Sequence, residues 1–549
     1  MSVPELSCMA DSDLRSGSSL REALRGIENA QSLVKELRDG SARLHVTPSQ
    51  VQQLVEALTV LGVASSAPDN SYDQDEDRGK LVLSGLDLMC DALDLTSASD
   101  ANKALTESLW PHVVRWLTTF RPTDRSFVGL RFEGLYDADR AVVLATRVYR
   151  TLFRAESITV GRLLKDQADS MQHLFKIWLD CPLYMSALTK GDDRLMATHN
   201  LTLALLDAHN ALARQKSPQI MVQSFYHQLR CVAPCTRSLY DQLVRQTQYL
   251  VRLPIAESSE EVLIAHFMLL TVIVANPKIP RAGPCSRSVI RGFIDAANCC
   301  LEHEKGFHAA CTATELFDAL CALDSDNRTL RRLIDAGVFD LLLRIGAKSR
   351  DGKVDKLAKR IAATFSLASF LRAFHARYRR VFPPRLPPPG PQYCRANWEL
   401  VIYMYHQQYG FYRGLRQIAQ WKKTLQCSRV EGPHRQTGPW GLGGVVTLND
   451  ILQLCMDVSC YIDANRASVG SRVLHLNRER LRARQRGTQI EIIADLTVTL
   501  GGDRYEVNAR ETKFGGLFSP TVVTGVQILL GGQKFRHLLP MTYDVKFFQ

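Results

Sequence analysis

The feature that most constrains the fold is a pair of apolar patterns with helical spacing between residues 309 and 347. In the first pattern, leucines recur every three or four residues from Leu316 to Leu323. A second apolar set follows the helix-capping run Asp324–Asn327 and continues past Gly337 to Ile345. Gly337 marks a position where one helix can end and another begin. The stretch predicts a short-loop helical hairpin, with one apolar stripe per helix, that needs similar neighbours to bury both faces.

Similar patterns fill residues 80–382, and no strand-like alternation interrupts them. We predict a mainly α fold here. Successive helical units of this kind, repeated without an exact period, fit an armadillo- or HEAT-like α-solenoid. An irregular globular helical domain is the alternative. The helices expected outside the hairpin are Leu81–Leu93, Ala101–Phe120, Ala138–Phe153, Val160–Leu179, Arg194–Leu212, Pro218–Cys231, Thr236–Val251, Glu260–Ala275, Arg287–Leu301 and Lys353–Tyr378.

The periodicity changes in residues 488–549, which predict a small β-rich, α+β element. Residues 488–500 are β-branched and roughly alternating, and a Gly-Gly-Asp turn follows them. A second pair of strand-like stretches flanks Gly531 and Gly532. We therefore expect two hairpins in this tail.

The remaining segments divide the chain further. Residues 1–79 are expected to hold a disordered start, two helices and an acidic loop. Residues 383–391 contain six prolines in nine positions, which predicts a stiff linker; a PxxP ligand for a partner domain is the alternative. Residues 392–487 are expected to form a further helical region.

Composition excludes some classes of protein. No apolar stretch approaches the roughly 20 residues that span a bilayer, and the N-terminus lacks the apolar core of a signal peptide. The 14 cysteines are scattered through helical segments, so we expect reduced thiols. These features predict an intracellular protein of the cytoplasm or nucleus, neither secreted nor in a membrane. The net charge of +12 is modest for 549 residues and does not by itself imply nucleic-acid binding.

Three short stretches carry a resemblance to a known family. The segment Trp110–Trp116 has the pattern W-P-x-V-x-R-W, Arg331–Val338 contains R-x-L-I-x-A-G, and the tail from Ile490 includes V-Q-I-L-L-G-G. Together they resemble the fungal MYND-type zinc-finger proteins of the large basidiomycete expansion. That resemblance implies an armadillo-like helical array, a MYND finger near the C-terminal third and a short tail.

The finger itself is degenerate in this chain. A MYND module holds two zinc ions with seven cysteines and one histidine, arranged in closely spaced pairs. Cys427 resembles one ligand of that module and His434 resembles its closing histidine, but the expected final cysteine falls at Gly438. No C-x2-C pair occurs anywhere in the sequence. We therefore expect no cofactor, and zinc only if the gene product carries an intact finger.

A basic run is the sharpest remaining motif. Between residues 478 and 486 five arginines face a single acid, Glu479; they are Arg478, Arg480, Arg482, Arg484 and Arg486. This run is a candidate nucleic-acid-binding site. The alternative is an ordinary solvent-exposed helix face. Catalytic motifs and phosphate-binding glycine loops are absent from the sequence. The prediction is a non-enzymatic scaffold that binds other proteins. A nucleic-acid-associated regulator is the first alternative, and a methyltransferase-type enzyme, a class that also carries MYND fingers, is the second.

Overall fold

The structure is a computed structural model of the chain. It describes short segments between residues 25 and 128, nearly all of 135–382 in runs separated by short gaps, 397–417, most of 458–485, and the backbone of strands between 493 and 544. The chain divides into two compact units, Met1–Ala282 and Gly283–Gln549. In the described residues the structure is mainly α, which confirms the predicted fold class at that level.

The first unit consists of helices and one minimal two-stranded ladder. The strands β1 (Arg121–Pro122) and β2 (Phe127–Val128) pair antiparallel. Short helical segments are described between residues 25 and 117, and the helices that follow are α5 (Leu135–Arg154), α6 (Ser157–Asp166), α7 (Ala168–Tyr184), α8 (Gly191–Ala213), α9 (Pro218–Val232), α10 (Thr236–Leu250) and α11 (Ser259–Val274). From α8 to α11 they match the predicted ranges closely. The predicted helix Val160–Leu179 is wrong in one respect, because the structure divides it between α6 and α7.

The second unit begins with another helical series. It contains α12 (Arg287–Glu302), α13 (Phe307–Ala322), α14 (Arg328–Ala336), α15 (Val338–Lys348), α16 (Asp355–Thr364), α17 (Ala368–Tyr378), α18 (Asn397–Gln417) and α21 (Arg466–Gln485). The predicted single helix Lys353–Tyr378 is instead the pair α16 and α17. Ser286 begins the series by capping α12, since its hydroxyl accepts a hydrogen bond of 3.2 Å from the Val289 amide.

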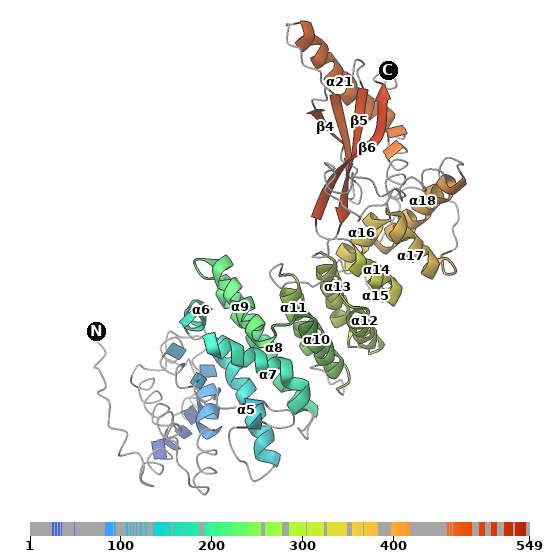
Figure 1. Cartoon of the computed structure of the whole chain (residues 1–549). Coiled ribbons are helices and arrows are strands. Elements are labelled where there is room, and N and C mark those ends of the chain that lie inside the picture. Colours follow the sequence, from blue (N-terminus) through green and yellow to red (C-terminus); the bar gives the residue numbers. More distant parts are fainter. Residues whose placement is uncertain are drawn as a thin grey trace. The chain divides into compact units, whose positions relative to one another are not determined.

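Within each unit, several helices pack against the third helix along the chain, and others pack against the second, as α6 does against α8 and α16 against α18. In the first unit α5 contacts α8, α7 contacts α10, and α8 contacts α11. In the second unit the same relation joins α12 to α15, α13 to α16, α14 to α17, and α15 to α18. Figure 1 labels these helices, so the order can be followed within each unit. The main helical contacts of the described residues therefore join elements that are close in sequence.

The expected helical hairpin becomes three helices, α13, α14 and α15. Gly337 adopts a left-handed conformation with φ 99°, which ends α14 and lets α15 begin at the next residue. A side chain at Gly337 would also collide with the guanidinium of Arg377, 2.6 Å from the position of an added Cβ. The predicted apolar stripes are confirmed as core, since Leu316, Leu333 and Leu341 are fully buried.

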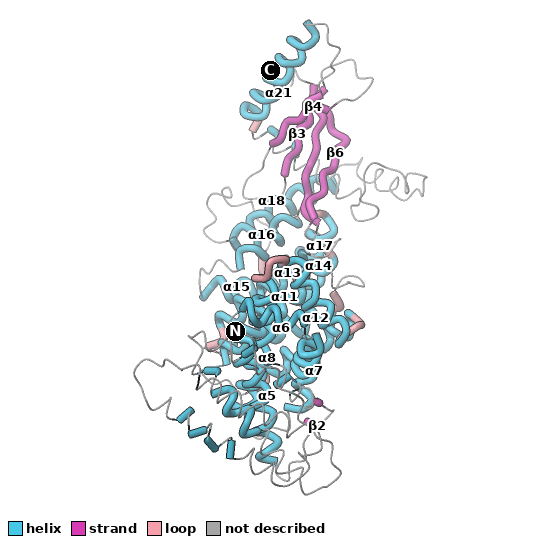
Figure 2. The backbone as a smooth tube through the Cα atoms, turned by 90° about the vertical axis from the view of Figure 1, so that its left-hand side faces the viewer, coloured by secondary structure: helices cyan, strands magenta, loops and turns pink. Residues whose placement is uncertain are grey.

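The strands of the second unit form a four-stranded sheet of order β4-β3-β5-β6. Its strands are β3 (Ile493–Thr499), β4 (Val507–Thr512), β5 (Thr521–Leu530) and β6 (Gln533–Asp544). β3 pairs antiparallel with β4, and β5 with β6, while β3 and β5 lie parallel at the centre. Figure 2 colours these strands magenta and the helices cyan.

Two further expectations can be compared with the structure. The nine described cysteines, Cys299 and Cys300 among them, form no disulfide with one another. Among the described residues, no helix has the length and apolar character needed to cross a membrane.

Candidate functional site

The residues suggested by the degenerate finger, Cys427 and His434, lie outside the described residues. In the described part of the chain, no group of three or more His, Cys, Asp or Glu side chains is placed to hold a metal ion. The basic run lies largely on α21. Arg478 is exposed there, Arg480, Arg482 and Arg484 fall within the same helix, and Arg486 lies outside the described residues.

The motifs that carry the family resemblance occupy structural positions. Trp110 is fully buried, and its ring stacks on Phe153 of α5 with centroids 5.4 Å apart. The second motif contains Leu333 and Ile334, which are buried, and ends at the left-handed turn of Gly337. The described residues of both motifs therefore contribute to packing or to the end of a helix.

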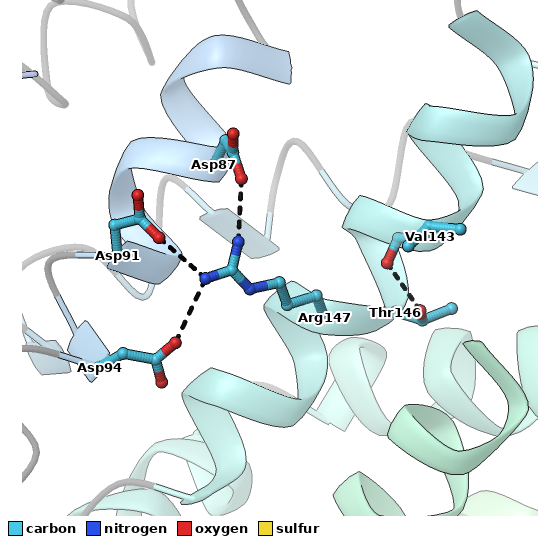
Figure 3. A network of polar contacts seen from close by, with 6 residues as sticks. All are labelled: Asp87, Asp91, Asp94, Val143, Thr146 and Arg147. Carbon is cyan, nitrogen blue, oxygen red and sulfur yellow. Dashed lines mark hydrogen bonds and ion pairs between the residues drawn. The ribbon is translucent and has the colours of Figure 1, made fainter. Parts of the chain in front are cut away.

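A cluster of three carboxylates surrounds one guanidinium in the first unit (Figure 3). Asp87, Asp91 and Asp94 are spaced three and four residues apart, so they share one face of a helical segment. Arg147 of α5 donates to them at 3.0, 2.8 and 3.3 Å, respectively. Burial opposes the charge on Arg147, but the hydrogen bonds that it donates to Asp91 and Asp94 and the negative charge of Asp91 outweigh this effect and raise its pKa.

This arrangement joins two helices and offers no chemistry of its own. Arg147 remains a permanent cation, so it cannot transfer protons. The neighbouring thiol of Cys90 is buried, which raises its pKa to about 12 and leaves it protonated and unreactive. Because the groups are partly exposed, the ion pairs contribute modestly to stability.

A buried polar network lies between α7, α10 and α11. The Thr247 hydroxyl donates to the Leu243 carbonyl at 2.8 Å and lies 2.8 Å from Nε2 of His266. Since the hydroxyl has only one proton, Nε2 of His266 carries its own and donates it to Thr247. The Nδ1 atom of His266 has no hydrogen-bond partner among the described residues. Beside it, Gln246 donates to the Trp178 carbonyl at 2.8 Å.

Burial controls the chemistry of this network. His266 has no exposed surface, and burial lowers its pKa to about 3. The imidazole is therefore neutral at physiological pH. Without a route to solvent or a second titrating group in contact, it is a structural histidine whose protonation is coupled to folding.

A third group of interacting side chains lies on α17 and α18 of the second unit and is partly exposed. His375 of α17 is bracketed by two hydroxyls of α18, with Nδ1 2.7 Å from Tyr405 and Nε2 2.9 Å from Tyr409. The His375 and Tyr409 rings stack with centroids 4.0 Å apart and an interplanar angle of 16°. Tyr405 is buried, whereas His375 and Tyr409 are each partly exposed. The rings of His375 and Tyr409 thus lie against each other, and each keeps part of its surface exposed.

Positive charge gathers beside these rings. Arg379 and Arg380 follow on α17 and its terminal turn, and Arg413 lies one helical turn beyond Tyr409 on α18; all three are exposed. Burial lowers the pKa of His375, and the charges of Arg379 and Arg413 lower it further. His375 therefore stays neutral in a cationic surrounding. No described carboxylate forms an ion pair with these three arginines.

The sequence contains a signal for this surface that motif searching overlooks. Between Lys356 and Val430 there are fourteen Lys or Arg residues and one acid, Glu399. The surplus of thirteen positive charges in this stretch exceeds the net charge of +12 of the whole chain. Net charge counted over a stretch as long as residues 356–430, rather than over runs of a few residues, indicates a basic region here. Arg478 and its neighbours contribute a separate and shorter run.

Comparisons with protein-family models, with curated proteins and with solved structures find no match to this chain.

Proposed function

We propose that the chain is a non-enzymatic scaffold whose helices form an armadillo-like array that binds other proteins inside the cell, in the cytoplasm or nucleus. The observation that carries this proposal is the packing of helices against the second or third helix along the chain, which recurs in both units, as between α5 and α8, α7 and α9, and α13 and α16. Contacts between near neighbours along the chain are typical of repeat arrays, in which each repeat contacts only its neighbours. Arrays of this kind present long surfaces, and protein binding is their usual role.

Exposed apolar side chains in the first unit suggest where a partner binds. Ile220 of α9 is 67% exposed, Met268 of α11 is 48% exposed, and Met196 of α8 is 50% exposed. Exposed large apolar groups are available for contact with another protein, and methionine adapts to varied partner surfaces. The titratable networks around Arg147 and His266 are accounted for by packing, which supports a binding role over catalysis.

The family part of the proposal rests on the sequence. The resemblance to fungal MYND-type proteins suggests a scaffold whose finger has lost its ligands, with the β-rich C-terminal element as a second module. The structure's four strands in order β4-β3-β5-β6 support such a module. A methyltransferase-type enzyme remains the less favoured reading, because the chain lacks a recognisable cofactor motif.

The second candidate function is a nucleic-acid-associated regulator that uses the basic run of α21. The exposed position of Arg478 on that helix favours it. Phosphate contacts weaken steeply with salt, so salt-dependent retention on DNA distinguishes this candidate from a scaffold that binds only proteins.

The scaffold is tested by affinity purification of the tagged full chain from its own cells. Proteins that co-purify with the natural sequence should be lost with the double variant Ile220→Asp/Met268→Asp, whose melting temperature should stay unchanged because both sites are exposed. Gln223→Asp, an exposed polar position on the same helix as Ile220, is the matched control and should retain them. If the double variant retains every partner, these side chains do not form the binding surface. If the natural sequence recovers no partner, the scaffold proposal fails.

A further inference from the structure

The surface on α17 and α18 goes beyond the proposed scaffold, since it has the features of a site for a polyanion. We define the α17–α18 basic surface by the three exposed arginines Arg379, Arg380 and Arg413 and the two stacked rings of His375 and Tyr409. Arg379 lies four residues after His375, and Arg413 lies four residues after Tyr409. Residues four apart share one helix face, so each of these two cations lies one turn from the aromatic pair.

Two other described cations of this region, Arg377 and Arg360, are already engaged. Arg377 pairs with Asp340 at 3.0 Å, and Arg360 pairs with Asp318 at 2.7 Å. Arg377 also donates to the Asp335 carbonyl at 2.6 Å, which fixes the end of α14 against α17. The arginines of the basic surface carry no such ion pair with a described carboxylate. Uncompensated like charges repel one another and destabilise the surface until an anion binds.

The side chains present favour phosphate over other anions. All three cations are arginines, whose planar guanidinium donates two parallel hydrogen bonds to a phosphate. The adjoining rings supply a second kind of contact, because bases of an unpaired strand stack on exposed aromatic faces. An acidic protein segment would satisfy the charges but would gain little from a flat, neutral ring pair.

We propose that the α17–α18 basic surface binds single-stranded nucleic acid, with Arg379, Arg380 and Arg413 on successive phosphates and the His375–Tyr409 pair against a base. The surplus of thirteen positive charges between residues 356 and 430 supplies the longer-range attraction. The site is independent of the scaffold's partner surface, which lies on other helices.

Fluorescence anisotropy of the full chain with labelled twenty-nucleotide oligo-dT and oligo-U tests this proposal. The triple variant Arg379→Ala/Arg380→Ala/Arg413→Ala should bind at least about tenfold more weakly. Its log affinity should fall less steeply with log salt, by about two units of slope, since each lost phosphate contact removes roughly 0.7. A control triple variant, Arg230→Ala/Arg252→Ala/Arg291→Ala, removes the same charge from exposed positions elsewhere and should bind like the natural sequence.

The ring contact is tested separately. Tyr409→Leu removes the stacking face and should weaken oligonucleotide binding about fivefold or more while leaving the binding of inorganic polyphosphate unchanged. Tyr409→Phe keeps the ring and should retain affinity. Melting temperatures of all variants establish that each one folds.

Several outcomes would overturn the proposal. The natural sequence would show no oligonucleotide binding, or both triple variants would lose affinity equally, which would show dependence on total charge alone. Preference for a polyglutamate peptide over both oligonucleotides would assign the surface to an acidic protein. Preference for duplex DNA, with Tyr409→Leu unaffected, would remove the role of the rings.

Discussion

The Nε2 atom of His266 lies 2.8 Å from the Thr247 hydroxyl, inside a core that gives the imidazole no exposed surface. The hydroxyl directs its proton to the Leu243 carbonyl, so this contact requires a protonated Nε2 and leaves Nδ1 as an acceptor without a described partner. Adding a proton at Nδ1 would place an uncompensated charge among apolar side chains. The first prediction follows from that cost.

Acid should destabilise the first unit through His266. An unfolded histidine has a pKa of about 6.5, and the folded pKa is about 3, so the unfolded chain takes up the proton first. Stability contributed by the neutral form is complete above pH 6.5 and is lost as the pH falls toward 3. Between pH 7.5 and pH 5 the loss should be about 2 kcal/mol.

Urea unfolding at those two pH values measures this loss. His266→Asn should be less stable at pH 7.5 but should lose about 2 kcal/mol less on acidification than the natural sequence. His303→Asn, at an exposed position, should follow the natural sequence. Equal acid sensitivity of the natural sequence and His266→Asn would show that other groups control the pH response.

Two glycine-to-alanine changes should have opposite effects. At Gly337 the φ of 99° strains any side chain, and the added Cβ would lie 2.6 Å from the guanidinium of Arg377, so Gly337→Ala should cost about 1 kcal/mol or more. Gly410 lies within α18 with no atom close to an added Cβ, so Gly410→Ala should stabilise by about 0.5–1 kcal/mol. Thermal unfolding measures both effects. A shift of the melting temperature in the same direction for both variants would contradict the left-handed turn at Gly337.

Leu333→Asp should unfold its part of the second unit. Leu333 is fully buried on α14, and an unpaired carboxylate there should cost about 3–5 kcal/mol. Arg331→Asp introduces the same residue two positions earlier on the exposed face, and it should change the midpoint little. An unchanged thermal midpoint for Leu333→Asp would place that face of α14 in solvent.

The purified chain should hold no stoichiometric structural zinc. Zinc modules fold when several thiolates are brought together, and Cys427 and His434 are the only residues in register with the finger. Metal analysis after a mild chelator should therefore find well under one zinc per chain. Two zinc ions that survive the chelator would restore an intact finger.

Apolar spacing predicted the helices well because burial is their main driving force. Leu330, Leu333 and Leu341 were assigned to the core from their periodicity, and each is fully buried. The helix boundary between α6 and α7 could not be predicted in the same way. The apolar period runs on through it, and no glycine or proline marks the break between Asp166 and Ala168.

The polar networks were beyond sequence reasoning for a different reason. Asp87 and Arg147 are sixty residues apart, and local patterns contain no information on which distant side chains meet. His375 and Tyr409 are separated by a proline-rich segment, so their stacking depends on how α18 returns to α17. The surplus of positive charge between residues 356 and 430 is visible in the sequence and indicates a basic surface. It does not identify the aromatic rings that lie on that surface.

The packing of helices against near neighbours along the chain also has a consequence for synthesis. The main packing partners of a given helix emerge from the ribosome shortly before or after that helix. Native contacts in both helical series therefore join segments that are near in sequence. The series α5–α11 can complete its packing before α12 is made, because its partners lie within Met1–Ala282. We expect the helical units to fold quickly and in order from the N-terminus, with the four-stranded sheet, which is synthesised last, forming last.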